Sequence, residues 1–255
     1  GNKIKAYGDE ELLEEFDRKM TMLMKHFAKY NKLDENVIER VLTSHTSDDY
    51  ATSNKSGEVL VHGVGGTLIK AQTANQRKLV ESMHKNDMVF AIGPAGTGKT
   101  YLAVAAAVAQ LLEGKYDRII LSRPAVEAGE KLGHLPGGIE DKVDPYMKSY
   151  KSNLVKIIGH EMTETLFEKR IIRFEPLAYM RGDTYDDALM ILDEAQNANF
   201  KQLMLFVTRM GSKSKVVVTG DVSQADIQAS QVSLPSFIEL IQDVKGVGTH
   251  IFTEK

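Results

Sequence analysis

The feature that most restricts the fold of this chain is an octapeptide with the pattern G-x-x-x-x-G-K-T, namely Gly93-Pro94-Ala95-Gly96-Thr97-Gly98-Lys99-Thr100. Residues 88–92 before it are an apolar run typical of a buried strand. Residues 100–112 after it are strong helix formers, apolar almost all round. In this order, glycines let backbone N–H groups turn onto phosphate oxygens, and the helix N-terminus adds its positive dipole end. The octapeptide therefore predicts a phosphate loop rather than a plain glycine turn.

The last two residues of the loop and an acid pair later in the chain are expected to act on the nucleotide phosphates and their metal ion. Lys99 is expected to reach the β- and γ-phosphates of a nucleotide, and the Thr100 hydroxyl to bind Mg²⁺. A second apolar run ends in Asp193 and Glu194, which puts both carboxylates at the carboxyl edge of a sheet, where open α/β sheets bind ligands. Asp193 would hold the Mg²⁺ shell and Glu194 would polarise an attacking water as general base. Alone, this acid pair is explained equally well by a helix N-cap, so its weight comes from the phosphate loop.

A third apolar run covers residues 215–219 and ends in Thr219, with Asp221 and Gln224 shortly after it. These three residues are therefore expected at the same edge of the sheet. Thr219 or Gln224 is placed there to sense the γ-phosphate by hydrogen bonding, and Asp221 to border the nucleotide. The alternative for this motif is an ordinary strand-to-turn junction built on Gly-Asp.

Other charged residues leave two interpretations open. Arg123 and Arg181 are suited to stabilising transition-state charge or touching a polymeric anion, and equally to surface ion pairs. Residues 142–156 interleave lysines with Tyr146 and Tyr150, as a track for single-stranded nucleic acid would. We favour an amphipathic helix with a solvated charged face for this segment. No metal-ligand spacing connects His26, His45, His84, His134 and His160.

Alternating strands and helices from about residue 71 predict a layered α/β fold. The expected strands are at 88–92, 118–122, 189–193, 215–219 and 249–253, and the expected helices at 72–85, 100–112, 138–158, 199–210 and 235–243. The stretch 123–187 exceeds an ordinary crossover and is expected to add a helix pair and a strand at 171–174.

The first seventy residues have a different pattern. We expect an amphipathic helix over 9–30, a short helix over 34–42, a polar linker over 43–57, and a hairpin from the runs at 58–61 and 67–69. The predicted organisation is a small α+β N-terminal segment, 1–70, and a nucleotide-binding domain, 71–255.

Composition excludes several classes of protein. The 255 residues contain no cysteine, no apolar run approaching the ~20 residues of a membrane span, and no signal peptide, so we expect a cytoplasmic protein without a membrane anchor. The net charge of −3 argues against a globally basic nucleic-acid binder and leaves a local basic groove open.

Over about residues 70–255 the chain resembles the PhoH-like (phosphate-starvation-inducible) P-loop ATPase family. The matching motifs are GPAGTGKTYLAVA at 93–105, RPAVEAGEKLG at 123–133, LPGG and KVDPY at 136–146, PLAYMRG at 176–182, ILDEAQN at 191–197 and TGDVSQ at 219–224. Members of this family look like the first motor domain of superfamily 1 helicases. The resemblance implies a RecA-like sheet, Gln76 as an adenine-reading residue, Glu194 as base and Gln224 as a γ-phosphate contact. It also implies a cytoplasmic location, homo-oligomeric rings (a hexamer among them) and single-stranded RNA as a partner.

The chain departs from the family pattern at both ends. The family continues past a strand like 251–254 into a segment with a further arginine, and its small N-terminal domain is KH-like. We therefore expect that both ends are trimmed here and that hydrolysis is weakened.

Taken together, these motifs predict an ATPase that couples Mg-ATP hydrolysis to work on RNA, with an arginine supplied by a neighbouring subunit. A nucleotide-gated binding module with little turnover is the alternative from another class. A nucleotide kinase is a third reading, which the strand ends Asp-Glu-Ala-Gln and Thr-Gly-Asp-x-x-Gln fit less well.

Overall fold

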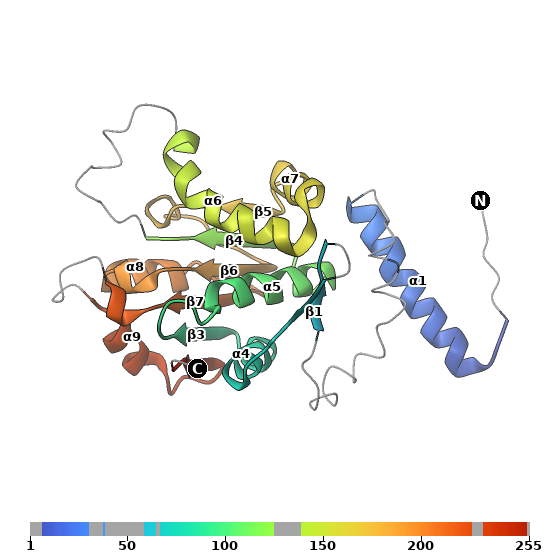
Figure 1. Ribbon diagram of the computed structural model, residues 1–255, viewed down its shortest axis with the longest axis horizontal. Helices are drawn as coiled ribbons and strands as arrows, with labels where there is room; N and C mark the ends of the chain where they lie inside the picture. Colours follow the sequence, from blue (N-terminus) through green and yellow to red (C-terminus); the bar gives the residue numbers. More distant parts are fainter. Residues whose placement is uncertain are drawn as a thin grey trace. The chain divides into compact units, whose positions relative to one another are not determined.

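A parallel sheet of six strands lies at the centre of the larger of two units in this computed structural model (Figure 1). The units are Gly1–Glu58 and Val59–Lys255, and the structure describes residues 7–30, 38, 59–64, 67–124, 139–225 and 232–253. The sheet order is β5-β4-β6-β7-β3-β8, with every neighbouring pair parallel. The strands are β3 (Met88–Ile92), β4 (Arg118–Ser122), β5 (Ile172–Phe174), β6 (Ala188–Leu192), β7 (Lys215–Gly220) and β8 (Val247–Ile251).

Helices cover both faces of this sheet, because its inner strands are apolar on both sides. Every residue of β6 and β7 is buried, as a parallel sheet between two helical layers requires. The helices of the unit are α4 (Ala74–Lys85), α5 (Lys99–Leu112), α6 (Ile139–Ile158), α7 (His160–Glu168), α8 (Phe200–Val207) and α9 (Leu234–Ile241). Three short 3₁₀ helices follow strands, namely η3 (Leu177–Tyr179), η4 (Ala195–Asn197) and η5 (Val222–Gln224).

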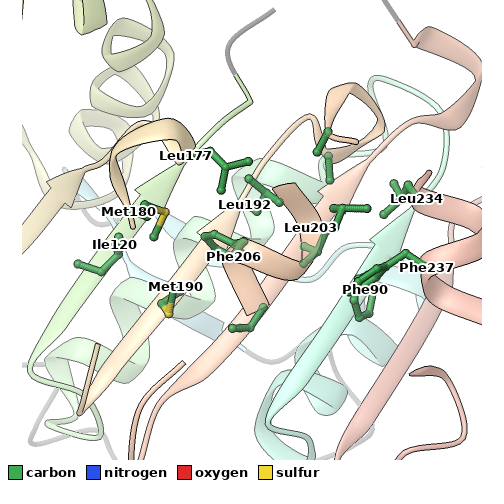
Figure 2. Close-up of a cluster of buried hydrophobic side chains, with 14 of the residues drawn as sticks. Phe90, Ile120, Leu177, Met180, Met190, Leu192, Leu203, Phe206, Leu234 and Phe237 are labelled. Carbon is green, nitrogen blue, oxygen red and sulfur yellow. The ribbon is translucent and has the colours of Figure 1, made fainter. Parts of the chain in front are cut away.

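Alternate residues of each strand pack against the helices on opposite faces of the sheet, since successive side chains of a strand point to opposite sides. On one face Met190 and Leu192 of β6 pack with Phe206 of α8 and Phe237 of α9 (Figure 2). On the other, α5 contacts β4, β6 and β7, and α4 contacts β3 and β8. The predicted α/β class, with a parallel sheet between helical layers, is confirmed.

The expected hairpin is present and contacts the sheet's helices. Strands β1 (Val59–His62) and β2 (Leu68–Lys70) pair antiparallel, and β1 contacts α5 and α6. Both strands lie in the unit Val59–Lys255, although the predicted domain boundary stands after residue 70. That boundary stays a prediction.

In the smaller unit, the predicted amphipathic helix is α1 (Glu10–Tyr30). The predicted helix over 34–42, apart from residue 38, and the linker over 43–57 lie outside the described residues. Within the described part of the chain, no helix is both long and apolar enough to span a bilayer.

Strand order positions the site. Because β7 lies between β6 and β3, the carboxyl ends of these three strands are neighbours, and each is followed by one of the motifs singled out in the sequence. The RecA-like arrangement expected from the resemblance is the one observed.

Candidate nucleotide site

The phosphate loop connects β3 to α5 and ends with Gly98 as the N-cap of α5, at a φ of 78° that favours glycine. Lys99, the first residue of α5, folds back into this loop. Its Nζ donates to the carbonyl oxygens of Gly93 and Pro94, both at 2.6 Å, and to Thr97 Oγ1 at 3.2 Å. Burial lowers the pKa of Lys99, while the nearby Asp221 and Asp193 act in the opposite direction. The loop therefore surrounds one ammonium group with its own oxygens.

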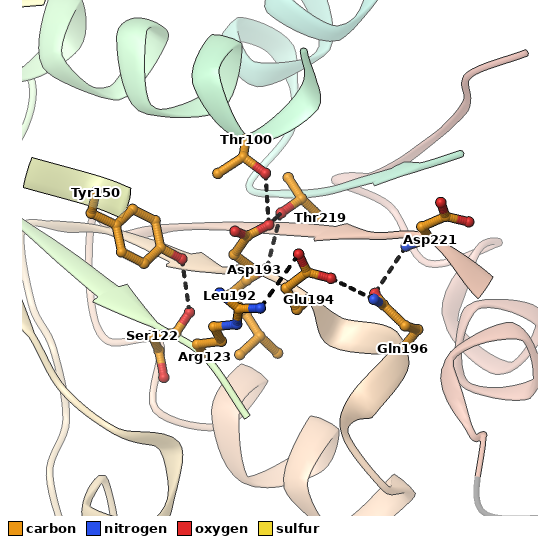
Figure 3. A network of polar contacts seen from close by, with 10 residues as sticks. All are labelled: Thr100, Ser122, Arg123, Tyr150, Leu192, Asp193, Glu194, Gln196, Thr219 and Asp221. Atoms are coloured by element: carbon orange, nitrogen blue, oxygen red, sulfur yellow. Dashed lines mark hydrogen bonds and ion pairs between the residues drawn. The ribbon is translucent and has the colours of Figure 1, made fainter. Parts of the chain in front are cut away.

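Asp193 contacts residues that follow two neighbouring strands or end them. Its Oδ1 accepts from the Thr100 hydroxyl at 2.7 Å and from the Thr219 hydroxyl at 2.5 Å (Figure 3). Asp193 is only 8% exposed and Thr219 is fully buried. One carboxylate oxygen thus ties the first turn of α5 to the ends of β6 and β7.

The donors around Asp193 fit a magnesium ion. Carboxylate and hydroxyl oxygens are hard ligands, and Mg²⁺ typically takes one or two protein oxygens together with substrate phosphates. Among the described residues there is no group of three or more His, Asp or Glu that could hold a metal without such a substrate. Thr100 and Asp193 therefore suit a metal that arrives with a nucleotide.

Glu194 lies beside Asp193 in an uncommon backbone conformation. Its φ and ψ of 55° and 39° are left-handed, and it is the N-cap of η4. Its Oε2 accepts from Gln196 Nε2 at 2.5 Å, and its Oε1 lies 3.6 Å from a guanidinium nitrogen of Arg123. Of the two arginines considered from the sequence, Arg123 lies near Glu194. Arg181 is exposed on the turn after η3.

Asp221 holds the phosphate loop to the end of β7. Its Oδ2 accepts from the Ala95 N–H at 2.8 Å, and its Oδ1 accepts from the Ser223 N–H at 3.0 Å and the Ser223 hydroxyl at 2.6 Å. Burial acts to raise the pKa of Asp221, but the hydrogen bonds from Ser223 and Ala95 outweigh it and the pKa is lowered. Both carboxylate oxygens are thus engaged by protein donors.

Gln76 lies at the start of α4 and also reaches the phosphate loop. Its Oε1 accepts from the Gln72 N–H at 2.7 Å and the Thr73 N–H at 3.3 Å, and its Nε2 donates to the Thr97 carbonyl at 3.1 Å. Its side chain is therefore close enough to the loop to border a nucleotide. Gln224 is exposed on η5. The adenine and γ-phosphate roles of these two glutamines stay predictions.

Two buried residues of the network had no predicted role in the nucleotide site. Gln196, 1% exposed, bridges Glu194 and the Asp221 N–H, and its only sequence signal is its place in the Asp-Glu-Ala-Gln motif. Tyr150 of α6, also 1% exposed, donates to the Ser122 carbonyl at 3.3 Å. Burial, with the charge of Asp193 next in size, raises the pKa of Tyr150.

The position of Tyr150 separates the two interpretations of residues 142–156, and this segment lies within α6, as the favoured helix requires. A buried phenol has no face on which a base can stack, so the track for single-stranded nucleic acid over 142–156 is wrong at Tyr150. Its neighbour Lys151 pairs with Glu164 at 3.3 Å and lies over the ring of Phe167. The Tyr146 side chain lies outside the described residues.

The family model described as "PhoH-like protein" matches residues 68–255, a range that includes every motif of this site. The chain belongs to the PhoH-like family. A PhoH-like protein of Bacillus subtilis (strain 168) is 43% identical over 249 residues, which cover 97% of this chain and 78% of that protein. A PhoH-like protein of Mycobacterium tuberculosis (strain H37Rv) is 46% identical over 183 residues, covering 71% of this chain and 52% of that protein. The chain thus spans about half the length of that PhoH-like relative.

Solved structures similar to this PhoH-like chain are remote. The UvsW helicase from bacteriophage T4 has a TM-score of 0.44 at 10% identity, covering 84% of this chain and 71% of that chain. The SWI2/SNF2 ATPase core of Sulfolobus solfataricus in complex with dsDNA has a TM-score of 0.42 at 15% identity, covering 71% of this chain and 44% of that chain.

Proposed function

We propose that this P-loop protein binds ATP with Mg²⁺ and hydrolyses it, coupled to binding or remodelling of single-stranded RNA in a helicase-like manner. The observation that carries the ATPase proposal is the bond between Thr100 and Asp193, which brings the phosphate loop and the acid pair to one point. Membership of the PhoH-like family supports it, because the matched residues include both motifs.

The residues at this point have complementary tasks. Lys99 would exchange the loop carbonyls for β- and γ-phosphate oxygens, and Thr100 with Asp193 would hold Mg²⁺, which neutralises charge on the phosphates when bound. Glu194 accepts a proton from a water whose oxygen bonds to the γ-phosphorus in line with the leaving group. The bond to the bridging oxygen breaks as that bond forms, so the products are ADP and inorganic phosphate.

The finer parts of this proposal rest on family resemblance. Gln76 would read adenine and Gln224 would contact the γ-phosphate, with Thr219 and Asp221 bordering the nucleotide. We further propose a cytoplasmic homo-oligomer in which a neighbouring subunit supplies an arginine, because an arginine contributed from outside the core stabilises the charge of the transition state in related phosphoryl-transfer sites.

A nucleotide-gated switch with little turnover is the second candidate. The observation that favours it is that each oxygen of Glu194 has a protein donor nearby, Gln196 Nε2 at 2.5 Å and a guanidinium nitrogen of Arg123 at 3.6 Å. In such a switch, these two contacts would hold Glu194 in place without its acting as a base.

Phosphate release from ATP with Mg²⁺, with and without single-stranded RNA, separates the two functions. The Glu194→Gln variant is expected to lower turnover about 10²-fold or more while it still binds nucleotide, since it loses a general base. Glu239→Gln, an exposed carboxylate on α9, is the matched control and should hydrolyse like the unchanged protein. ATP binding without turnover in the unchanged protein would contradict the enzyme and support the switch. Turnover that RNA does not raise would contradict the coupling to RNA.

A further inference from the structure

The side chain of Gln196 is fully enclosed between two parts of the site. Its Nε2 donates to Glu194 Oε2 at 2.5 Å, and its Oε1 accepts from the Asp221 N–H at 2.9 Å (Figure 3). The residue is 1% exposed and packs against the backbone of Gly220, where an added Cβ would lie 3.1 Å from Gln196 Oε1. The amide therefore has little room to rotate.

The orientation of this amide is determined by charge. Turned over, its oxygen would face the Glu194 carboxylate and its NH₂ would face the Asp221 N–H, so both bonds would be lost and like groups would oppose each other. A buried amide left with unmatched partners is costly. Gln196 therefore presents a donor to Glu194 and an acceptor to the chain after β7.

The same contacts continue to the phosphate loop. Asp221, whose N–H donates to Gln196, accepts from the Ala95 N–H with its own carboxylate. Hydrogen bonds thus connect Glu194 to Ala95 by way of Gln196 and Asp221, so two buried side chains link the phosphate loop to Glu194.

We propose that Gln196 is the positioning residue of Glu194, holding one carboxylate oxygen so that the other is directed to the attacking water, and that it links this position to the phosphate loop. The inference rests on the proposed function, because only a hydrolysing site needs a placed base. The two ends of the Gln196 side chain have different tasks. The Oε1 end supports the loop at Asp221, and the Nε2 end holds the base.

Two variants separate these tasks. Gln196→Glu keeps an oxygen for the Asp221 N–H but puts a second carboxyl group against Glu194, and their repulsion makes the pair share a proton, so the variant spares the support of the loop and disturbs the base. Gln196→Leu removes both bonds without adding charge. Gln202→Glu is the matched control, because the Oε1 of Gln202 also accepts a backbone N–H, that of Asn199 at 2.9 Å, and a glutamate retains that bond.

The experiment measures kcat and KM for ATP in the full chain, with the affinity for a fluorescent ATP analogue and the melting temperature of each variant. We expect Gln196→Glu to lower kcat about 10²-fold, as a misplaced catalytic group does, with KM and analogue affinity near those of the unchanged protein. Gln196→Leu should lower kcat less, because it does not repel Glu194, and Gln202→Glu should not lower it.

Three outcomes would overturn the inference. Turnover by Gln196→Glu equal to that of Gln202→Glu would show that the donor end has no role in placing the base. A loss of analogue affinity and melting temperature that accounts for the loss of kcat would show a structural role alone. Absence of turnover in the unchanged protein, with Glu194→Gln no different, would refute the proposed function and this inference together, a result distinct from an active protein that tolerates Gln196→Glu.

Discussion

At the scale of single residues, Glu194 has a strained backbone conformation and lies in the middle of the candidate site. For a residue with a Cβ, a left-handed conformation costs roughly 1–2 kcal/mol, and such strain gathers at functional sites. Here the conformation turns the chain from the end of β6 directly into η4, which brings Gln196 back toward Glu194. The strain is thus tied to the placement of the carboxylate.

Replacing Glu194 by glycine should relieve this strain. We expect Glu194→Gly to have a free energy of unfolding about 1 kcal/mol larger than that of Glu194→Ala, since both lack the carboxylate and only glycine adopts φ of 55° without penalty. Urea denaturation of the two variants measures the difference. Equal stabilities would mean that the backbone at residue 194 is relaxed.

Which residues of the site could be predicted depended on where their partners lie in the chain. Lys99, Thr100 and Asp193 belong to motifs at strand ends, and parallel strands bring such ends to one edge whatever their order. Gln196 and Tyr150 could not be placed in this way, because neither follows directly on a strand end and their partners are backbone groups, the Asp221 N–H and the Ser122 carbonyl. Those pairings follow from strand order and burial, which no local pattern specifies.

At the scale of elements, α4 connects helix stability to the phosphate loop. Its N-cap, Thr73, accepts from the Gln76 N–H, while Gln76 accepts from the Thr73 N–H, which is a complete capping box. The same Gln76 donates to Thr97 of the loop. Among the described residues, the strands and helices that were given ranges were predicted to within a few residues, because apolar runs and capping signals are local. The capping box begins α4 at Ala74 rather than at the predicted residue 72.

Removing the cap should therefore have two effects. Thr73→Ala is expected to reduce the free energy of unfolding by about 1 kcal/mol and to weaken nucleotide binding by loosening Gln76. Asn199→Ala removes the equivalent cap of α8, which also has a capping box, and should cost similar stability without changing nucleotide affinity. Urea denaturation and titration with an ATP analogue test both. Equal nucleotide affinities for the two variants would exclude Gln76 from the site.

At the scale of the whole molecule, the first glycine of the phosphate loop packs against the chain that follows β8. A Cβ on Gly93 would lie 2.3 Å from the Phe252 carbonyl oxygen and 2.6 Å from its Cβ. Phe252 is 3% exposed, and its N–H donates to the Ile92 carbonyl at 2.6 Å. Neither backbone can move without disturbing the strand pairing beside it.

A methyl group at Gly93 should consequently be tolerated poorly. We expect Gly93→Ala to lower the free energy of unfolding by about 3 kcal/mol, combining overpacking with backbone strain. Gly114→Ala is the control, because Gly114 has a φ of 74° but open space at its Cβ, and it should cost only the strain of about 1–2 kcal/mol. Denaturant midpoints of the two variants provide the comparison. A loss at Gly93 no greater than that at Gly114 would mean that Phe252 yields.

The place of β3 between β7 and β8 has a consequence for how the protein is made. The phosphate loop leaves the ribosome early, yet both strands that flank β3 are synthesised only after residue 214. Pairing between such distant segments is slow, because a long loop must close before the contacts form. A nascent chain that already exposes the loop therefore lacks the two strands that flank β3, and the nucleotide site forms only after β7 and β8 have been synthesised.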